Sequence, residues 1–92
     1  MATYSATRAK NATLSTTTVD TITLNQKWEA VEITNADASN ALYVRVDGTA
    51  ATAAGDDCTM ILPASSKVIA LGGSTTVSII GNGNVYSCEG VK

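Results

Sequence analysis

The clearest strand of the sequence is Leu42-Tyr43-Val44-Arg45-Val46-Asp47, which is followed at once by Gly48. Aliphatic residues alternate with charged or aromatic ones along this stretch, so one face is apolar while the other meets solvent or a further layer. The Asp-Gly step at its end tolerates the positive backbone φ of a turn. The stretch therefore predicts a half-buried β-strand with Val44 at the centre of a core.

The same pattern continues on both sides of this strand. Short runs of β-branched residues are separated by Gly, Asn and Asp, and turn signals recur every ~8 to 12 residues. A short helix is feasible only within residues 7–14. The chain of 92 residues is short enough for one domain. We therefore expect an all-β fold, a single small antiparallel β-sandwich or barrel of about six to seven strands. The expected strands are 19–24, 28–35, 42–47, 58–62, 68–71, 75–80 and 85–89.

The predicted core is small and aliphatic. The sequence has 14 Ala and 19 Val, Ile or Leu, but one Trp, three Tyr and no Phe. A domain of this size buries only ~60 to 65 % of the surface that its unfolded chain exposes, so partner subunits are expected to add stability. Such a neighbour would also cover Tyr43 and Ile80 on the outward faces of their strands. The expected core residues are Val31, Ile33, Leu42, Val44, Val46, Met60, Leu62, Val77 and Ile79.

The first 18 residues differ from the rest of the chain. They are rich in Ala, Thr, Ser and Asn and carry two bases and no acid, whereas residues 19–92 carry four bases and eight acids. Their few apolar groups cannot form a core, but extended Thr-rich chain is suited to strand addition onto a neighbour. We predict an N-terminal arm over residues 1–18 that is mobile in the free protein, and a β domain over residues 19–92. The predicted subunit-contact residues of the arm are Tyr4, Arg8, Lys10 and Leu14.

The residue types argue against catalysis and metal binding. The absence of histidine removes most zinc sites and every histidine-based proton shuttle. Asp47, Asp56 and Asp57 could offer oxygen ligands to Ca²⁺, but their spacing is not that of an EF-hand, and solvated loop carboxylates are the simpler interpretation. We expect no enzyme activity, no catalytic residues, no metal and no cofactor.

The net charge and the hydropathy of the chain argue against nucleic acid and membrane as partners. A formal net charge of −2 and a pI near 4.7 disfavour nucleic acid, which needs a basic footprint. No run of 18 apolar residues is present, and the N-terminal sequence lacks the apolar stretch of a signal peptide. We expect a chain that is not secreted by the usual route and that contacts neither membrane nor nucleic acid.

The two cysteines, Cys58 and Cys88, leave two interpretations open. They are 30 residues apart without a CxxC motif, so a metal site is disfavoured. A protein made in a reducing cytoplasm is expected to keep them as thiols, while a disulfide between them remains the alternative. We predict that no disulfide is required.

The chain resembles the small virion structural proteins of tailed bacteriophages, in particular those of actinobacterial phages. The likeness lies in the general residue pattern of nearly all 92 residues and not in a catalytic motif. The segments that carry it are Tyr4-Ser5-Ala6-Thr7-Arg8-Ala9-Lys10, Ala12-Thr13-Leu14, Thr18-Val19-Asp20-Thr21-Ile22-Thr23-Leu24, Val31-Glu32-Ile33-Thr34-Asn35, Leu42-Tyr43-Val44-Arg45-Val46-Asp47-Gly48-Thr49, Ala54-Gly55-Asp56-Asp57, Leu62-Pro63-Ala64 and Tyr86-Ser87-Cys88-Glu89-Gly90.

The resemblance implies a capsid decoration, or cement, protein. Such a protein assembles in the host cytoplasm, sits on the capsid surface, binds the major capsid protein and associates with itself, with a trimer favoured. The alternative is a tail or fibre module that binds host surface glycan, in which exposed Trp28 and Tyr43 would stack on sugar rings. The exposure of Trp28 discriminates between the two: a buried indole that is insensitive to quencher fits a cement protein, and an exposed indole that sugar quenches fits an adhesion module.

Overall fold

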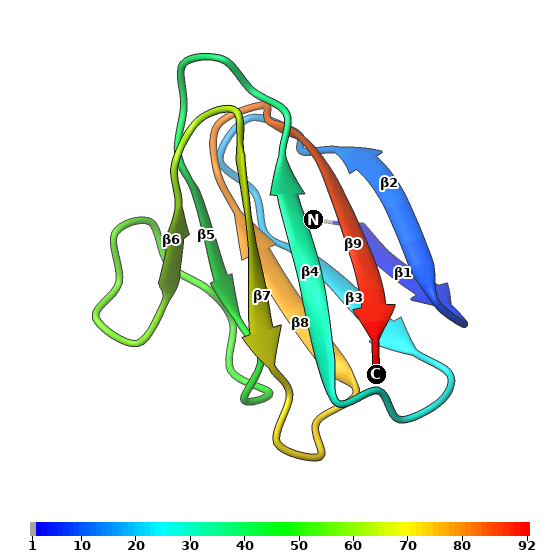
Figure 1. Cartoon of the computed structure of the whole chain (residues 1–92). Helices are drawn as coiled ribbons and strands as arrows, with labels where there is room; N and C mark the ends of the chain where they lie inside the picture. The colour runs from blue at the N-terminus through cyan, green and yellow to red at the C-terminus, as the bar shows by residue number, and fades with distance from the viewer. Residues whose placement is uncertain (1) are drawn as a thin grey trace.

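The computed structural model describes residues 2–92 and shows a two-layer β-sandwich (Figure 1). The described residues form nine strands and no helix. The strands are β1 (Ala2–Ala6), β2 (Ala9–Thr13), β3 (Asp20–Leu24), β4 (Ala30–Asn35), β5 (Leu42–Arg45), β6 (Thr59–Ile61), β7 (Ser65–Ala70), β8 (Thr76–Ile80) and β9 (Val85–Val91).

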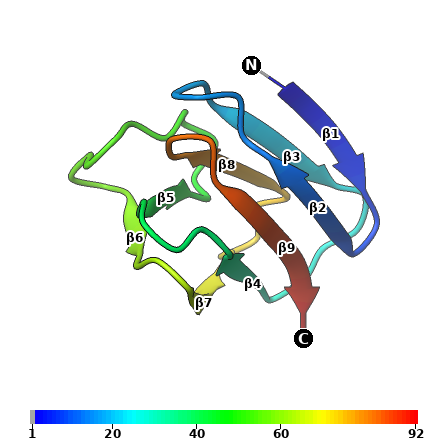
Figure 2. The same cartoon turned by 90° about the horizontal axis from the view of Figure 1, so that it is seen from above.

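The nine strands divide between two sheets. Sheet A has the order β1-β3-β8-β5-β6 and sheet B the order β2-β9-β4-β7. All strand pairs are antiparallel except β1 with β3, which is parallel. Seen from above, β1 and β2 lie at one side of the sandwich and β6 and β7 at the other (Figure 2). The sandwich prediction is confirmed, and the sheets do not close into a barrel.

Each of the seven strands predicted within residues 19–92 is present, with ends shifted by a few residues. Period-two patterning explains the agreement. Along β3 and β4, for example, buried residues alternate with half-buried ones without interruption. The alternation turns Ile22, Leu24, Val31 and Ile33 toward the space between the sheets, where all four are buried.

The predicted core is right at six positions and wrong at two. Val31, Ile33, Leu42, Val44, Val77 and Ile79 are buried, and Val46 packs partly buried against them. Met60 and Leu62 are exposed instead, and Ile61 between them is buried, because pairing with Leu42 turns Ile61 toward the core. The run Cys58 to Leu62 is apolar at nearly every position, so its alternation alone could not show which side faces inward.

The N-terminal residues correct the prediction of a separate arm. β1 and β2 are edge strands of the two sheets, and residues on both sides of the predicted boundary at 18/19 contribute to each sheet. β2 also lies where a short helix was considered feasible. The physical reason is that an edge strand is held mainly by backbone hydrogen bonds, which need few apolar side chains. Residues 2–13 therefore add as strands to the chain's own sheets, whereas the prediction concerned a neighbouring subunit.

Buried polar side chains join parts of the fold that the strands alone do not connect. The Tyr86 hydroxyl of β9 donates to Asp20 Oδ2 of β3 at 2.8 Å, which links the two sheets through the core. Burial, and then this hydrogen bond, raises the pKa of Tyr86, so the hydroxyl keeps its proton. Within residues 2–92 no buried side-chain nitrogen or oxygen lacks a hydrogen-bond partner.

Asn35 and Asn84 form a buried amide pair at one end of the sandwich. Asn84 Nδ2 donates to Asn35 Oδ1 at 3.0 Å and to the carbonyl of Asn40 at 2.9 Å. Asn35 Nδ2 donates to the carbonyls of Asn40 at 2.9 Å and Ile61 at 3.1 Å. The pair therefore connects the end of β4, the loop 36–41, the end of β6 and the turn before β9.

Candidate functional site

The side formed by β1 and β2 contains three of the four predicted subunit-contact residues, and each already has a partner within the chain. Lys10 Nζ lies 4.4 Å from the centroid of the Tyr4 ring, across the opening between the two sheets. Arg8, in the bend between the strands, pairs with Glu89 at 3.3 Å and donates to the carbonyl of Gly90. The contact of Tyr4 with Lys10 joins β1 to β2, and Arg8 attaches the bend between them to β9.

Leu14, the fourth predicted contact residue, is a core residue. It is buried among the aliphatic side chains of both sheets, and its amide donates to the carbonyl of Asn84 at 2.8 Å. Its role as a spaced apolar anchor is therefore fulfilled inside the chain.

Trp28, the residue chosen to discriminate between cement and glycan-binding functions, is half-buried. Its Nε1 donates to the carbonyl of Thr7 at 2.8 Å, and one part of its ring lies directly on Gly90. Arg8 and Lys92 each place a cationic group 5.8 Å from the ring centroid. The indole therefore packs the β1–β2 bend onto β9, and sequence reasoning missed this role because Gly90 comes 62 positions later in the chain.

Gly90→Ala is expected to destabilise the fold by about 1 to 3 kcal/mol, the usual cost of overpacking. A Cβ at this position would lie 2.6 Å from Trp28 Cγ and Cδ2, and the hydrogen bond of Trp28 to Thr7 resists its displacement. A double-mutant cycle by urea unfolding checks the result. In a Trp28→Ala background the cost of Gly90→Ala should nearly vanish, and an equal cost in both backgrounds would refute the contact.

The opposite side of the sandwich carries exposed apolar side chains. Met60 is 44 %, Leu62 55 % and Val68 62 % exposed, and all three belong to the edge strands β6 and β7 or to the connection between them. Met60 shares the outer face of sheet A with its partner Tyr43, whereas Val68 shares the outer face of sheet B with its partner Glu32. We call these exposed side chains together the apolar edge. Met60 is opposite Tyr43 in the strand pairing, and Tyr43 is opposite Ile80, so an apolar row continues from the edge across sheet A.

The apolar edge is protected against indiscriminate strand pairing. Lys67 of β7 is opposite the buried Ile33 of β4, which places an exposed cation on the core-facing side of an edge strand. β6 has only three residues. Inward-facing lysines and very short edge strands are devices that prevent edge-to-edge aggregation. A partner would therefore contact this surface through side-chain packing.

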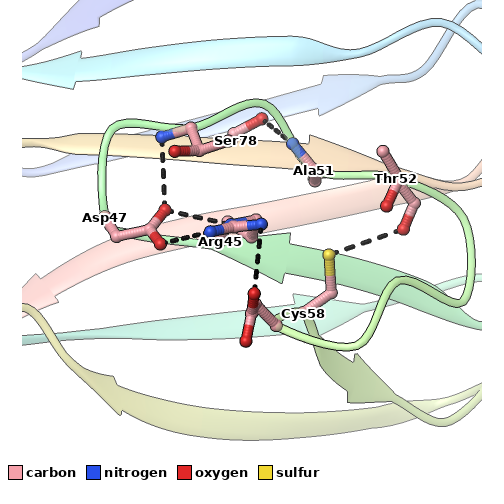
Figure 3. Close-up of polar contacts among 8 residues, drawn as sticks. Arg45, Asp47, Ala51, Thr52, Cys58 and Ser78 are labelled. Atoms are coloured by element: carbon pink, nitrogen blue, oxygen red, sulfur yellow. Dashed lines mark hydrogen bonds and ion pairs between the residues drawn. The ribbon is translucent and has the colours of Figure 1, made fainter.

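Residues 46–58 form a loop that folds back over the outer face of sheet A (Figure 3). The amide of Ala51 donates to Ser78 Oγ at 2.8 Å, and both residues are buried. Ile80, which we expected a neighbouring subunit to cover, is already buried within the isolated chain, whereas Tyr43 remains half-buried. The expectation that a neighbouring subunit must cover this face is therefore wrong for Ile80.

Arg45 anchors the acidic side chains of this loop (Figure 3). Its Nε donates to Asp47 Oδ1 at 3.0 Å, and its Nη1 lies 3.8 Å from Asp57 Oδ2. Asp47 also accepts from the amide of Thr49 at 3.2 Å. Both carboxylates therefore pair with Arg45, while their side chains stay 53 % and 77 % exposed, as the interpretation of solvated loop carboxylates expects. Among residues 2–92 there is no group of three or more Asp, Glu, Cys or His side chains that could hold a metal ion.

The Asp47 carboxyl is expected to stay ionised to unusually low pH. The hydrogen bond from Arg45, followed by that from Thr49, lowers its pKa from 3.8 to about 2. Because the pKa of this carboxyl is lower in the folded than in the unfolded protein, its ionised form stabilises the fold when the pH is above the unfolded pKa. This contribution to stability is lost as the pH falls from about 4 to about 2. NMR titration of the carboxyl carbon checks the value. In Arg45→Gln the pKa of Asp47 should move up toward 3.8, and an unchanged pKa would contradict the pairing.

Both cysteines are free thiols in the structure. Cys88 is buried in the core, where burial raises the pKa of its thiol to about 12, while Cys58 lies at the end of the loop and donates to the carbonyl of Thr52 at 3.4 Å. Since the thiolate is the reactive form, iodoacetamide at pH 8 should modify Cys58 and spare Cys88 until the protein unfolds. Mass spectrometry of the native and urea-unfolded protein, with Cys58→Ser as control, checks this. Equal modification of both cysteines in the native protein would contradict the buried position of Cys88.

The surface of residues 2–92 contains no pocket. No helix of this part of the chain is long and apolar enough to cross a membrane. Comparison with known protein families and with curated proteins finds no match. The candidate functional surfaces are therefore the two sides of the sandwich at which the sheets end, the β1–β2 side and the apolar edge.

Proposed function

We propose that the protein is a non-enzymatic structural component of a phage virion that decorates and cements the icosahedral capsid. Its partners in this proposal are the major capsid protein and further copies of itself, with a trimer favoured. The apolar edge is the observation that carries the proposal, because three large apolar side chains stay exposed on the edge strands at one side of the sandwich, where each can pack against a subunit. The sequence resemblance supplies the class of partner.

The hydrogen bonds inside the sandwich support a structural role at a particle surface. The two sheets are linked through the core by Tyr86 and Asp20, and the amide pair of Asn35 and Asn84 closes one end. Every buried side-chain nitrogen and oxygen of the described residues has a hydrogen-bond partner. Fully satisfied buried networks rigidify a fold and specify one arrangement. A rigid body that presents an apolar edge meets the needs of a protein that joins neighbouring subunits.

The position of Trp28 weighs against the alternative of a glycan-binding module. Sugar recognition by stacking needs an open aromatic face, and the Trp28 ring lies against Gly90 with Arg8 and Lys92 nearby. Tyr43 is half-buried within the row that leads to the apolar edge. We therefore keep the capsid function as the single proposal.

Binding to capsids tests the proposal. Capsids of the source phage, stripped of this protein, are titrated with the wild-type chain and with Leu62→Asp and Val68→Asp. Each variant should bind about tenfold more weakly or worse, since a carboxylate replaces an apolar side chain that becomes buried on assembly. Ala38→Asp, which adds the same charge to an exposed position of the loop 36–41, serves as the matched control.

Two outcomes would overturn the proposal. The first is wild-type affinity of both edge variants, with circular dichroism showing that they are folded. The second is the absence of the chain from the capsid in a cryo-electron microscopy reconstruction of the source virion.

A further inference from the structure

We propose that β1 and β2 (residues 2–13) exchange between two copies of this chain, so that each copy completes both sheets of the other. The pair is joined to the rest of the molecule only through residues 14–19, and the proposal holds whether or not the protein binds a capsid. The partner is a second copy because the acceptor edges are already shaped for this segment.

The acceptor surfaces are one edge in each sheet. β1 pairs with β3 over five positions, and β2 pairs with β9 over five positions. Between β3 and β9 the segment contributes Tyr4, Ala6 and Ala12 as partly buried groups against the core. Backbone hydrogen bonds therefore supply most of its attachment, and another copy of the same segment makes identical bonds.

Charge adds to this complementarity. The bases of the segment are Arg8 and Lys10, whereas residues 19–92 carry twice as many acids as bases. Arg8 meets Glu89 of β9 at 3.3 Å. A segment from a second copy finds the same carboxylate in the same place, so the exchange keeps this ion pair as well.

The connection after β2 favours release of the segment. Thr16 has φ of 43°, which is the left-handed region, and it is a β-branched residue for which this conformation is strained. The turn is closed by the amide of Thr18, which donates to the carbonyl of Ser15 at 3.0 Å. In an exchanged dimer residues 15–19 extend, and Thr16 returns to ordinary β conformation. Strained hinge loops of this kind promote exchange.

A pair of introduced cysteines can report which copy supplies β2. Asn11 and Ser87 are cross-strand partners on β2 and β9. The hydrogen bonds Leu14 N to Asn84 O and Gly90 N to Arg8 O fix the alternation, so Asn11 and Ser87 form a non-hydrogen-bonded pair with Cα atoms ~4.5 Å apart. That separation allows a disulfide. The variant is Asn11→Cys with Ser87→Cys in a Cys58→Ser background.

The variant is prepared in a ¹⁵N-labelled and an unlabelled form, and equal amounts of the two are mixed and refolded together. One mixture is refolded at about millimolar and another at micromolar concentration, and each is then oxidised. Residues 14–19 hold the segment close to its own sheets at an effective concentration of about millimolar, so a second copy can compete for these sheets only when the protein itself is about millimolar. Exchange predicts that, at millimolar concentration, about half of the peptide pairs joined through positions 11 and 87 carry one labelled and one unlabelled partner. Pairs of a single label only, at both concentrations, would overturn the proposal.

The hinge is tested separately with the wild-type cysteines. Thr16→Gly accepts positive φ without strain, so it should lower the dimer association constant about tenfold or more, measured by analytical ultracentrifugation. Thr17→Gly is the matched control, because Thr17 is exposed and has no positive φ. Equal dimerisation of the two variants would show that strain at Thr16 does not drive the exchange and would overturn that part of the proposal.

Discussion

Val44→Asp is expected to abolish folding at pH 7. Val44 is 1 % exposed and lies on β5 between β8 and β6, opposite Ile79 and Thr59. A carboxylate at this place would enter a core that is aliphatic apart from Tyr86, whose hydroxyl is already bonded to Asp20, and Cys88. Its burial costs several kcal/mol, which is on the order of the whole stability of a domain of this size, about 5 to 14 kcal/mol.

Val68→Asp is the matched control, since it makes the same substitution in a strand at a residue that is 62 % exposed. Circular dichroism and urea unfolding measure both variants. The control should fold with a midpoint near that of the wild type, while Val44→Asp should show no cooperative transition. A cooperative transition of Val44→Asp at the midpoint of Val68→Asp would mean that Val44 is not in the core.

Asn35→Asp is expected to destabilise the fold by several kcal/mol although it hardly changes the shape of the side chain. The substitution removes the Nδ2 group that donates to the carbonyls of Asn40 and Ile61. It leaves these acceptors facing a carboxylate in a fully buried site. Each buried group without a partner costs about 1 to 3 kcal/mol, and a buried charge adds to that.

Asn11→Asp is the corresponding control, because Asn11 is an exposed asparagine of a β-strand. The free energy of unfolding in urea at pH 7 measures both variants. The control should lose no more than about 0.5 kcal/mol, as surface substitutions usually do. If Asn35→Asp were as stable as Asn11→Asp, the amide pair would not hold the end of the sandwich together.

Side-chain alternation assigns a residue to the core only where polar and apolar residues clearly alternate. Leu42 and Val44 could be assigned to the core from the sequence because charged or aromatic residues separate them, and both are buried. Met60 and Leu62 could not, because their neighbours are apolar too. The side that faces inward is chosen there by pairing with β5, a contact between residues that are remote in the chain.

The candidate surfaces were predictable to a smaller extent. Tyr4 and the two bases of the N-terminal segment stood out by charge and composition, yet their partners within the chain, such as Glu89 beside Arg8, come from strands far along the sequence. The apolar edge was missed because two of its residues, Met60 and Leu62, were predicted to lie in the core. Exposure depends on which strands end a sheet, and this order is a property of the whole topology.

Local rules of side-chain alternation and turn chemistry were enough for the all-β class, the seven strands of residues 19–92 and most of the core, since these rules act between neighbours in sequence. The assignment of β1 and β2 to opposite sheets, the contact of Trp28 with Gly90, the contact of Ala51 with Ser78 and the amide pair of Asn35 and Asn84 needed the assembled fold. Each of these contacts joins residues that are remote in the sequence, and the groups attract each other only after folding has brought them within a few ångströms. The sequence pattern does not show which remote residues will come that close.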